Sequence, residues 1–170
     1  ELLRSLDELL NQDGFMGFEN TGDGEFFVNC GHGFGASPHN EVMRQARDLY
    51  DQVSFLNEDG TPNLLASPYY TTQSLRQIGL KQENRDQQLP GMMVYASDVL
   101  CPKNFRTGKV SRTSRTVSIH HFTASWVDEK IKAEMAHQQK VKNVFGPKVG
   151  RCVLYAESVF EKYSPAEMIT

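Results

Sequence analysis

The sequence predicts an α/β fold, with a mixed β-sheet, flanking helices and a helical C-terminus. Two observations predict this class. Short apolar runs bounded by turn residues, typical of strands, occur along the chain together with segments whose apolar residues recur every three or four positions, typical of helices. The chain also has 170 residues, of which 39% are apolar, enough to bury a core. Strands mixed with helices on this scale indicate an α/β or α+β domain.

The first third of the chain predicts two helices and a pair of strands. A helix is expected over residues 1–10, where five leucines lie at helical spacing: Leu2, Leu3, Leu6, Leu9 and Leu10. Strands are expected at residues 15–20 and 25–29, on either side of the turn sequence TGDG. A second helix is expected from residue 38 to 53, with Ser37 as its N-cap and Pro38 at its first position.

The remainder of the chain continues the mixture and ends in helices. Its predicted segments are a helix at 69–79 that ends at Gly79, a polar flexible connection at 81–91, a buried strand at 92–102, a strand at 116–122, and helices at 127–145 and from 149 onward. The sequence GPKVG separates the last two helices, because Gly and Pro interrupt helical structure.

Charge and composition exclude several classes of protein. The net charge of −3 argues against a nucleic-acid-binding protein, because such proteins carry a surplus of Lys and Arg. Cys30, Cys101 and Cys152 are odd in number and widely spaced, which argues against a disulfide framework and favours a reducing, cytoplasmic location. No apolar run approaches the roughly 18 to 20 residues that a membrane-spanning helix needs.

Two loops are candidates for binding anions. Gly31, Gly33 and Gly35 lie between a predicted strand and a predicted helix, where phosphates often bind. Their G-x-G-x-G spacing differs from the G-x-G-x-x-G of dinucleotide-binding folds, so a tight structural turn is favoured over a phosphate cradle. The basic loop, residues 103–115, carries Lys103, Arg106, Lys109, Arg112 and Arg115. A solvated loop is favoured there over an anion-binding role.

The sequence TVSIHHFTASW, residues 116–126, contains two adjacent histidines. In an extended strand, neighbouring side chains point to opposite faces, so His121 would share the apolar face with Val117 and Ile119. His120 would then lie on the more polar face. We therefore interpret His121 as a core histidine and His120 as the better candidate for a metal ligand.

A divalent metal at His120 would usually need carboxylates as well. Asp98 and Glu19 lie near the ends of other predicted strands and are the candidates. The spacing contains no established metal-binding pair, so a histidine with only a structural role is favoured on the residues alone. The role of Trp126 is also open: its side chain could pack in the core or stack on a base or a sugar.

Several segments, taken in order, resemble the C-terminal part of family 32 glycosyltransferases, the bacterial capsular-polysaccharide type with a D-x-D sugar-binding region. The matching segments are LRSLDELL, FMGFEN, FFVNCGHGFGAS, ARDLYDQVSF and the pattern T-x-x-T-x-x-I-H-H-x-x-x-S-W at residues 113–126. The last of these is the most specific. The resemblance implies that residues 1–126 are the C-terminal part of a GT-A-like catalytic domain, an incomplete GT-A-type fold, and that residues 127–170 are a helical extension.

The resemblance implies a metal-dependent, retaining hexosyltransferase. Such an enzyme uses Mn²⁺ or Mg²⁺ and transfers a sugar from a nucleotide-sugar donor to a glycan or glycolipid acceptor of the cell surface or capsule. By position, it implies catalytic roles for Asn29 and Ser125, donor-binding roles for Trp126, Ser125 and Thr116, and a metal-binding role for His120. It also implies a cytoplasmic protein that associates peripherally with the inner face of the membrane.

The D-x-D carboxylates of that family do not occur in this sequence. Their place in the family pattern would fall immediately before Glu1. The chain does not begin with Met, and no residues precede the predicted first helix to supply its N-cap, so we expect it to continue upstream in a longer protein. The alternative is a protein that has lost its catalytic half, and in either case we expect these 170 residues alone to be inactive.

Two other functions are open on the sequence. A non-catalytic carbohydrate- or protein-interaction domain is suggested by the absence of D-x-D and by the aromatic residues Tyr69, Tyr70 and Trp126. A metallohydrolase built on His120, His121 and Asp98 is less favoured, because strand alternation would separate the two histidines.

Overall fold

The structure is a computed structural model of the chain, and it describes residues 1–21, 24–123 and 128–162. The chain divides into two compact units. Unit 1 comprises Glu1–Phe105 and Val110–His121, and the rest of the chain forms unit 2. The domain boundary predicted after residue 126 falls within residues 124–127, outside the described residues.

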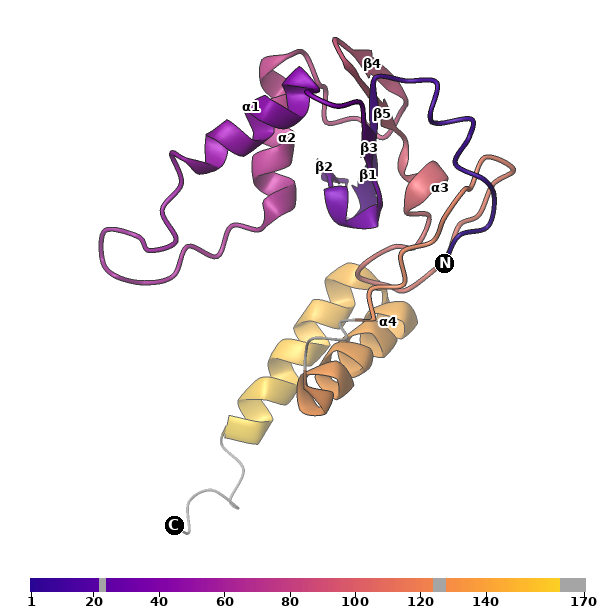
Figure 1. Ribbon diagram of the computed structural model, residues 1–170. Helices are drawn as coiled ribbons and strands as arrows, with labels where there is room; N and C mark the ends of the chain where they lie inside the picture. The colour runs from indigo at the N-terminus through magenta and orange to yellow at the C-terminus, as the bar shows by residue number, and fades with distance from the viewer. Residues whose placement is uncertain (22–23, 124–127, 163–170) are drawn as a thin grey trace. The chain divides into compact units, whose positions relative to one another are not determined.

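Unit 1 is built on a mixed five-stranded sheet (Figure 1). The strands are β1 (Gly14–Asn20), β2 (Phe26–Val28), β3 (Gly35–Ala36), β4 (Gln87–Leu89) and β5 (Met92–Tyr95). β5 runs parallel to β1 along one edge, while β2 and β3 pair antiparallel with the two ends of its other edge. β4 extends the sheet as an antiparallel neighbour of β5. The predicted α/β fold with a mixed sheet is confirmed.

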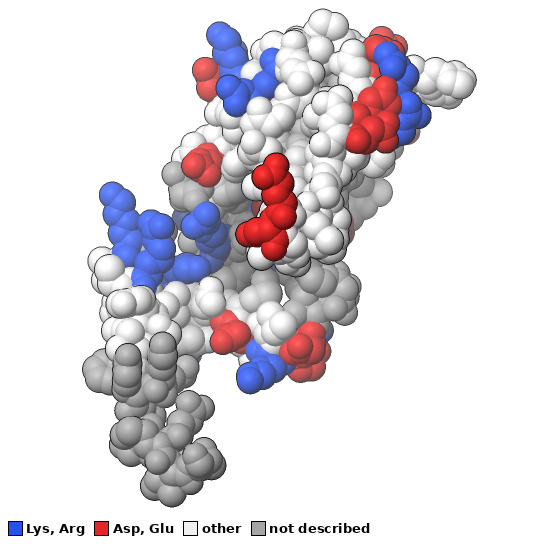
Figure 2. All heavy atoms as spheres, turned by 90° about the vertical axis from the view of Figure 1, so that its left-hand side faces the viewer, with Lys and Arg blue, Asp and Glu red and all other residues white. Residues whose placement is uncertain are grey.

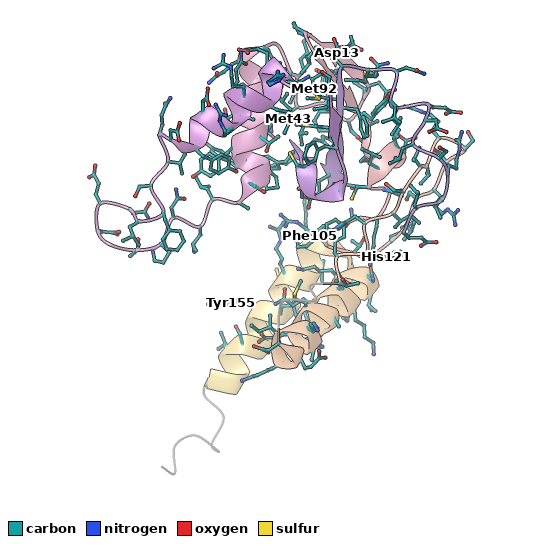
Figure 3. The ribbon with its side chains drawn as sticks, viewed as in Figure 1. Asp13, Met43, Met92, Phe105, His121 and Tyr155 are labelled. Atoms are coloured by element: carbon teal, nitrogen blue, oxygen red, sulfur yellow. The ribbon has the colours of Figure 1, made fainter. Side chains whose placement is uncertain are left out.

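Helices lie against the sheet in unit 1. They are the 3₁₀ helix η1 (Cys30–His32), α1 (Glu41–Tyr50), α2 (Ser67–Gln77) and α3 (Ser97–Leu100). Met16 and Phe18 of β1 belong to an apolar cluster that includes Val42 of α1 and Leu75 of α2. Met43 of α1 packs against the same cluster, on the side of the sheet where Met92 lies (Figure 3). This cluster is the larger part of the core.

A second apolar cluster covers the opposite face of the sheet. Phe15 of β1 joins Val99 and Leu100 of α3, together with Leu9 and Val117. Because side chains alternate along a strand, β1 contributes to both clusters, and its residues from Gly14 to Glu19 are all buried. A strand covered on both faces is expected to be nearly continuously apolar, and β1 is so as far as Phe18.

The start of α1 differs from the prediction. Ser37 is not the N-cap, because α1 begins only at Glu41; the amide of Ser37 donates to the carbonyl of Asp13 (2.8 Å) as the chain leaves β3. His39 has a φ of 61°, which is incompatible with a helix beginning at residue 38. The N-cap is Asn40, whose side chain accepts from the amide of Met43 (3.1 Å) and donates to the carbonyl of Gly91 (2.9 Å). Asn40 thereby ties the helix to the β4–β5 turn.

The helix predicted over residues 1–10 is wrong. The backbone of residues 1–4 instead lies beside residues 117–119. The amide of Leu3 donates to the carbonyl of Val117 (2.8 Å), and the amide of Ile119 donates to the carbonyl of Glu1 (2.9 Å). Backbone groups that bond to a distant segment cannot also close helical turns. Residues 7–11 form turns that bury Leu9.

Three other predicted segments differ in extent. The segment predicted as a strand at 116–122 has a single bridge, between Leu2 and Ser118. On its other side the amide of Val117 donates to the carbonyl of Val99 in α3 (2.8 Å), so no strand ladder forms there. The strand predicted at 92–102 ends at Tyr95 and continues as α3. The predicted polar connection at 81–91 contains β4. The short helix ending near Gly79 is confirmed as α2.

Unit 2 contains α4 (Glu129–Lys162), which is two helices joined at a kink. Gly146 has φ 78° and ψ 162°, so the predicted break at GPKVG is confirmed. The two limbs lie side by side (Figure 1), and His137 Nε2 contacts Glu157 Oε2 across them (2.8 Å). A side chain in place of Gly150 would bring its Cβ within 3.0 Å of the Lys142 backbone. None of the helices described here is long and apolar enough to cross a membrane.

Phe18 provides a test of the core. Its side chain is fully buried and meets the ring of Phe26 edge-on, with centroids 6.4 Å apart. Phe18→Ala is expected to reduce the free energy of unfolding by about 3–5 kcal/mol, since it removes a buried ring and leaves a cavity. Urea unfolding followed by circular dichroism measures this. Phe55→Ala, at a site that is 75% exposed, is the control and should stay within about 0.5 kcal/mol of the wild type.

Candidate functional site

The C-terminal end of β1 and the turn after β2 bring Glu19, Asn29 and His32 together. The amide of Asn29 donates to the carbonyl of Gly17 (3.1 Å), which keeps this turn against β1. Asn29 is also the N-cap of η1, and its Oδ1 accepts from the amide of Gly31 (2.8 Å). Its Nδ2 donates to Glu19 Oε2 (2.8 Å) and lies 3.3 Å from His32 Nε2. Both ends of the Asn29 amide are therefore held by the protein.

His32 is the buried centre of this cluster. Its side chain has no exposed surface, and Nε2 lies 3.7 Å from Glu19 Oε2. Burial, with a smaller effect from nearby His120, lowers the pKa of His32 to about 3. The imidazole is therefore neutral near pH 7. Since Asn29 Nδ2 can only donate, Nε2 of His32 is the acceptor and its proton is assigned to Nδ1.

His120 joins the cluster from a distant part of the sequence. Its ring centroid lies 4.9 Å from that of His32, with the two ring planes inclined at 43°. Burial, the N-terminal amine, His121 and Lys103 all lower the pKa of His120. His120 is therefore biased toward the neutral form, in which a ring nitrogen can accept a hydrogen bond or bind a metal.

The burial predicted for the two adjacent histidines is wrong: His121, predicted in the core, is the more exposed of the two. His120 is half-buried against His32, whereas the side chain of His121 is 43% exposed and its Nε2 contacts Glu1 Oε2 (2.8 Å). Val117 and Ile119 are buried as expected. The alternation fails after them because this segment is not part of a regular strand, and Phe122 immediately beyond has a φ of 54°.

The first residue of the chain lies at the same place. The N-terminal amine donates to the carbonyl of Ile119 (3.0 Å), and the Lys103 ammonium donates to the carbonyl of His121 (2.6 Å). The site is therefore framed by three segments in unit 1: the N-terminus, the turn after β2, and residues 119–121.

Thr116 has a structural environment. It is buried, and its Oγ1 donates to the carbonyl of Asp98 (2.8 Å) and accepts from the amide of Thr113 (2.9 Å). These bonds hold the turn at residues 113–116 against α3. Ser125 and Trp126, the other residues assigned to the donor by resemblance, lie outside the described residues.

The described residues do not form a metal site of their own. Within residues 1–21, 24–123 and 128–162, no group of three or more His, Cys, Asp or Glu side chains is placed to hold a metal ion. Asp98 Oδ2 accepts from Thr113 Oγ1 (2.9 Å), and Glu19 is bonded to Asn29. A Mn²⁺ or Mg²⁺ ion near His120 would need ligands from beyond these residues. His120, His121 and Asp98 do not form such a group among the described residues.

The glycine-rich turn has the features of a structural turn. Gly33 has a φ of 114°, and a Cβ at Gly35 would lie 2.4 Å from the ring of Phe15. The Gly31 amide is already bonded to Asn29. A nearby cleft of about 380 Å³ is lined by Ala36, Ser37, His39, Asn40, Met43, Arg44 and Arg47. Arg44 there pairs with Glu41 and Asp48, which compensates its charge.

Part of the basic loop is also engaged within the protein. Arg115 donates to Asp86 Oδ2 (2.5 Å), and Lys103 is bonded to the His121 carbonyl. On the face shown in Figure 2, several Lys and Arg side chains lie beside Asp or Glu side chains, and neither sign covers the whole face. The cysteines are free thiols, as predicted.

His32 is the one residue of the cluster that the sequence reasoning missed. The residues themselves indicate Glu19 as a candidate carboxylate and His120 as a candidate metal ligand, and the resemblance adds Asn29. The available signal was a histidine between two glycines, three residues after an Asn that ends a predicted strand.

In comparisons with known proteins, no protein-family model, curated protein or solved structure matches the chain.

The buried neutral His32 predicts a dependence of stability on pH. Its pKa is about 3 in the folded state against an ordinary value of 6.5, so the unfolded chain binds more protons between these values. Stability is thus fully present above pH 6.5 and falls as the pH drops toward 3. We expect a loss of up to about 1.4 kcal/mol per pH unit from this residue, or a few kcal/mol in total.

Urea unfolding at a series of pH values measures the effect as a difference from His32→Gln, which lacks the titrating ring. The exposed His39→Gln should keep the wild-type slope and serves as the control. Parallel curves for wild type and His32→Gln between pH 6.5 and 4 would contradict the prediction.

Proposed function

We propose that this chain is part of a metal-dependent, retaining glycosyltransferase that moves a sugar from a nucleotide-sugar donor to a cell-surface or capsular glycan. In this proposal, unit 1 is the C-terminal part of a GT-A-type catalytic domain. Mn²⁺ or Mg²⁺ would stabilise the negative charge of the leaving diphosphate, and ligands from a preceding D-x-D segment would complete its site.

The observation that carries the proposal is that Asn29 and His120 both lie beside His32. The resemblance assigns both to one active site, although they lie far apart in the sequence. In the structure they are linked through His32, which is 3.3 Å from Asn29 Nδ2 and whose ring lies 4.9 Å from the His120 ring. A cluster of polar side chains around a buried histidine is common at functional sites.

The position of Glu1 is a second support. The family pattern puts the D-x-D carboxylates directly ahead of this residue. Glu1 lies alongside Ile119 and contacts His121, so a segment preceding it would enter the structure next to His120. Carboxylates supplied in this way would provide the oxygen ligands that Mn²⁺ and Mg²⁺ prefer.

The test uses the intact protein with Mn²⁺ and a panel of nucleotide-sugar donors. His120→Ala is expected to lower donor hydrolysis or sugar transfer by at least about 10- to 100-fold, the loss typical of removing a ligand or its orienting partner. Isothermal titration with Mn²⁺ and nucleoside diphosphate should show weaker binding by the variant. His39→Ala is the matched control, because its side chain is exposed and lies outside the cluster, and it should retain most activity.

Equal activity of wild type and His120→Ala would remove His120 from the site. A wild-type protein that binds glycan, with no effect of metal or nucleotide, would favour an interaction domain instead.

One feature supports the interaction domain as a second candidate: the loop at residues 51–66 is internally hydrogen-bonded, with the Asn63 amide donating to the Phe55 carbonyl (2.7 Å). It nevertheless leaves Phe55 75% and Leu64 89% exposed.

We also propose that the protein associates with the inner face of the membrane, where a glycolipid acceptor would lie. Between Glu134 and Glu157 the sequence has no acidic residue, while its basic residues are Lys140, Lys142, Lys148 and Arg151. Val144, Phe145 and Val149 in the same stretch are 52–67% exposed. Basic and exposed apolar side chains together suit an anionic lipid surface.

Vesicle sedimentation tests the association. The triple variant Lys140→Ala, Lys148→Ala, Arg151→Ala is expected to bind phosphatidylserine-containing vesicles roughly 100-fold less tightly, at about 1 kcal/mol for each basic side chain. The control variant Arg44→Ala, Arg47→Ala, Lys81→Ala removes the same charge from unit 1 and should bind like the wild type. Binding that is equal for neutral vesicles, or absent for both kinds, would contradict the proposal.

A further inference from the structure

The polar contacts around Asn29 leave its amide a single orientation. The carboxylate of Glu19 and the ring nitrogen Nε2 of His32 take up both donor positions of Nδ2, at 2.8 and 3.3 Å. The Gly31 amide takes one acceptor position of Oδ1 (2.8 Å). An amide oxygen has two lone pairs, so Oδ1 retains the capacity to accept one further hydrogen bond.

Glu19 and His32 can hold the Asn29 amide in this orientation because both side chains are buried. The side chain of Glu19 is 12% exposed and that of His32 has no exposed surface. Glu19 lies on β1, where its backbone pairs with Phe27 of β2, and its carboxylate is bonded to Asn29. His32 follows Asn29 by three residues in η1, which Asn29 itself caps.

We infer that Glu19 and His32 are positioning residues, which hold the Asn29 amide so that its oxygen accepts a hydrogen bond from a hydroxyl group of the sugar or acceptor. This inference rests on the proposed function and extends it to two residues that the resemblance does not assign. It excludes the opposite arrangement, in which Asn29 would donate to the ligand, because both Nδ2 hydrogens already have acceptors in the protein.

His32 has a second contact, with the ring of His120, and the two contacts can be separated by substitution. His32→Phe retains an aromatic ring beside His120 but removes the acceptor for Asn29 Nδ2. His32→Gln removes the ring but keeps an acceptor oxygen on a side chain long enough to reach the amide. If His32 acts by positioning Asn29, His32→Phe should be the damaging change and His32→Gln should restore most of the activity.

The experiment measures kcat and KM for sugar transfer by the intact protein. His32→Phe is expected to lower kcat about 10- to 100-fold, as is typical for loss of a partner that orients a site residue, and His32→Gln by less than about 5-fold. In an Asn29→Ala background, His32→Phe should have no further effect on kcat, because residues that act as one unit are not additive. A purely structural role would instead lower the melting temperature of both variants and leave kcat per folded molecule unchanged.

A second measurement does not depend on activity. Hydrogen exchange of the Asn29 side-chain amide, followed by ¹⁵N NMR, should be slow in the wild type, slow in His32→Gln and faster in His32→Phe. The exposed side-chain amide of Gln52 provides the unprotected reference. Exchange of Asn29 as fast as this reference in the wild type, or equal kcat for His32→Phe and wild type, would overturn the inference. An intact wild-type protein that transfers no sugar but shows the expected exchange pattern would reject the proposed function and leave the orientation of Asn29 standing.

Discussion

Strand β1 is paired along both edges and covered on both faces, and the rest of unit 1 depends on this arrangement. Its central position forces Met16 and Phe18 into one apolar cluster and Phe15 into the other. The helices α1, α2 and α3 are held against the sheet by those side chains. Glu19 follows directly, at the end of the strand, so the same constraint that builds the core also fixes the first residue of the candidate site.

The candidate site is polar because it lies where the apolar part of β1 ends. A buried carboxylate next to a buried imidazole would be costly without hydrogen bonds. Asn29 supplies them, bonding Glu19 and contacting His32. The protein thereby keeps a neutral histidine and an oriented amide close to His120, which is an environment that a ligand or metal-bound group could use and that an ordinary apolar core would not provide.

Periodicity in the sequence predicted those elements whose structure depends on local patterns. The strands β1 and β2, the helix α2 and the break at Gly146 follow from alternation, helical spacing and glycine. The prediction failed where long-range pairing decided the outcome: the leucines of residues 1–10 suggest a helix, but Leu3 bonds to Val117 instead. His32 was missed for a similar reason, since its packing against the ring of His120 brings together segments that are far apart in the sequence.

The pairing of Glu1 with Ile119 has a consequence for how the protein folds. The β4–β5 pair and the α1–α2 pair join residues close in sequence, whereas this contact closes a separation of 118 residues. Contacts that require closing such long loops form late, because the chain loses entropy before they stabilise it. During synthesis, the first residues must wait for residue 119 to leave the ribosome before they can pair. We therefore expect the surroundings of His120 to be the last part of unit 1 to be completed.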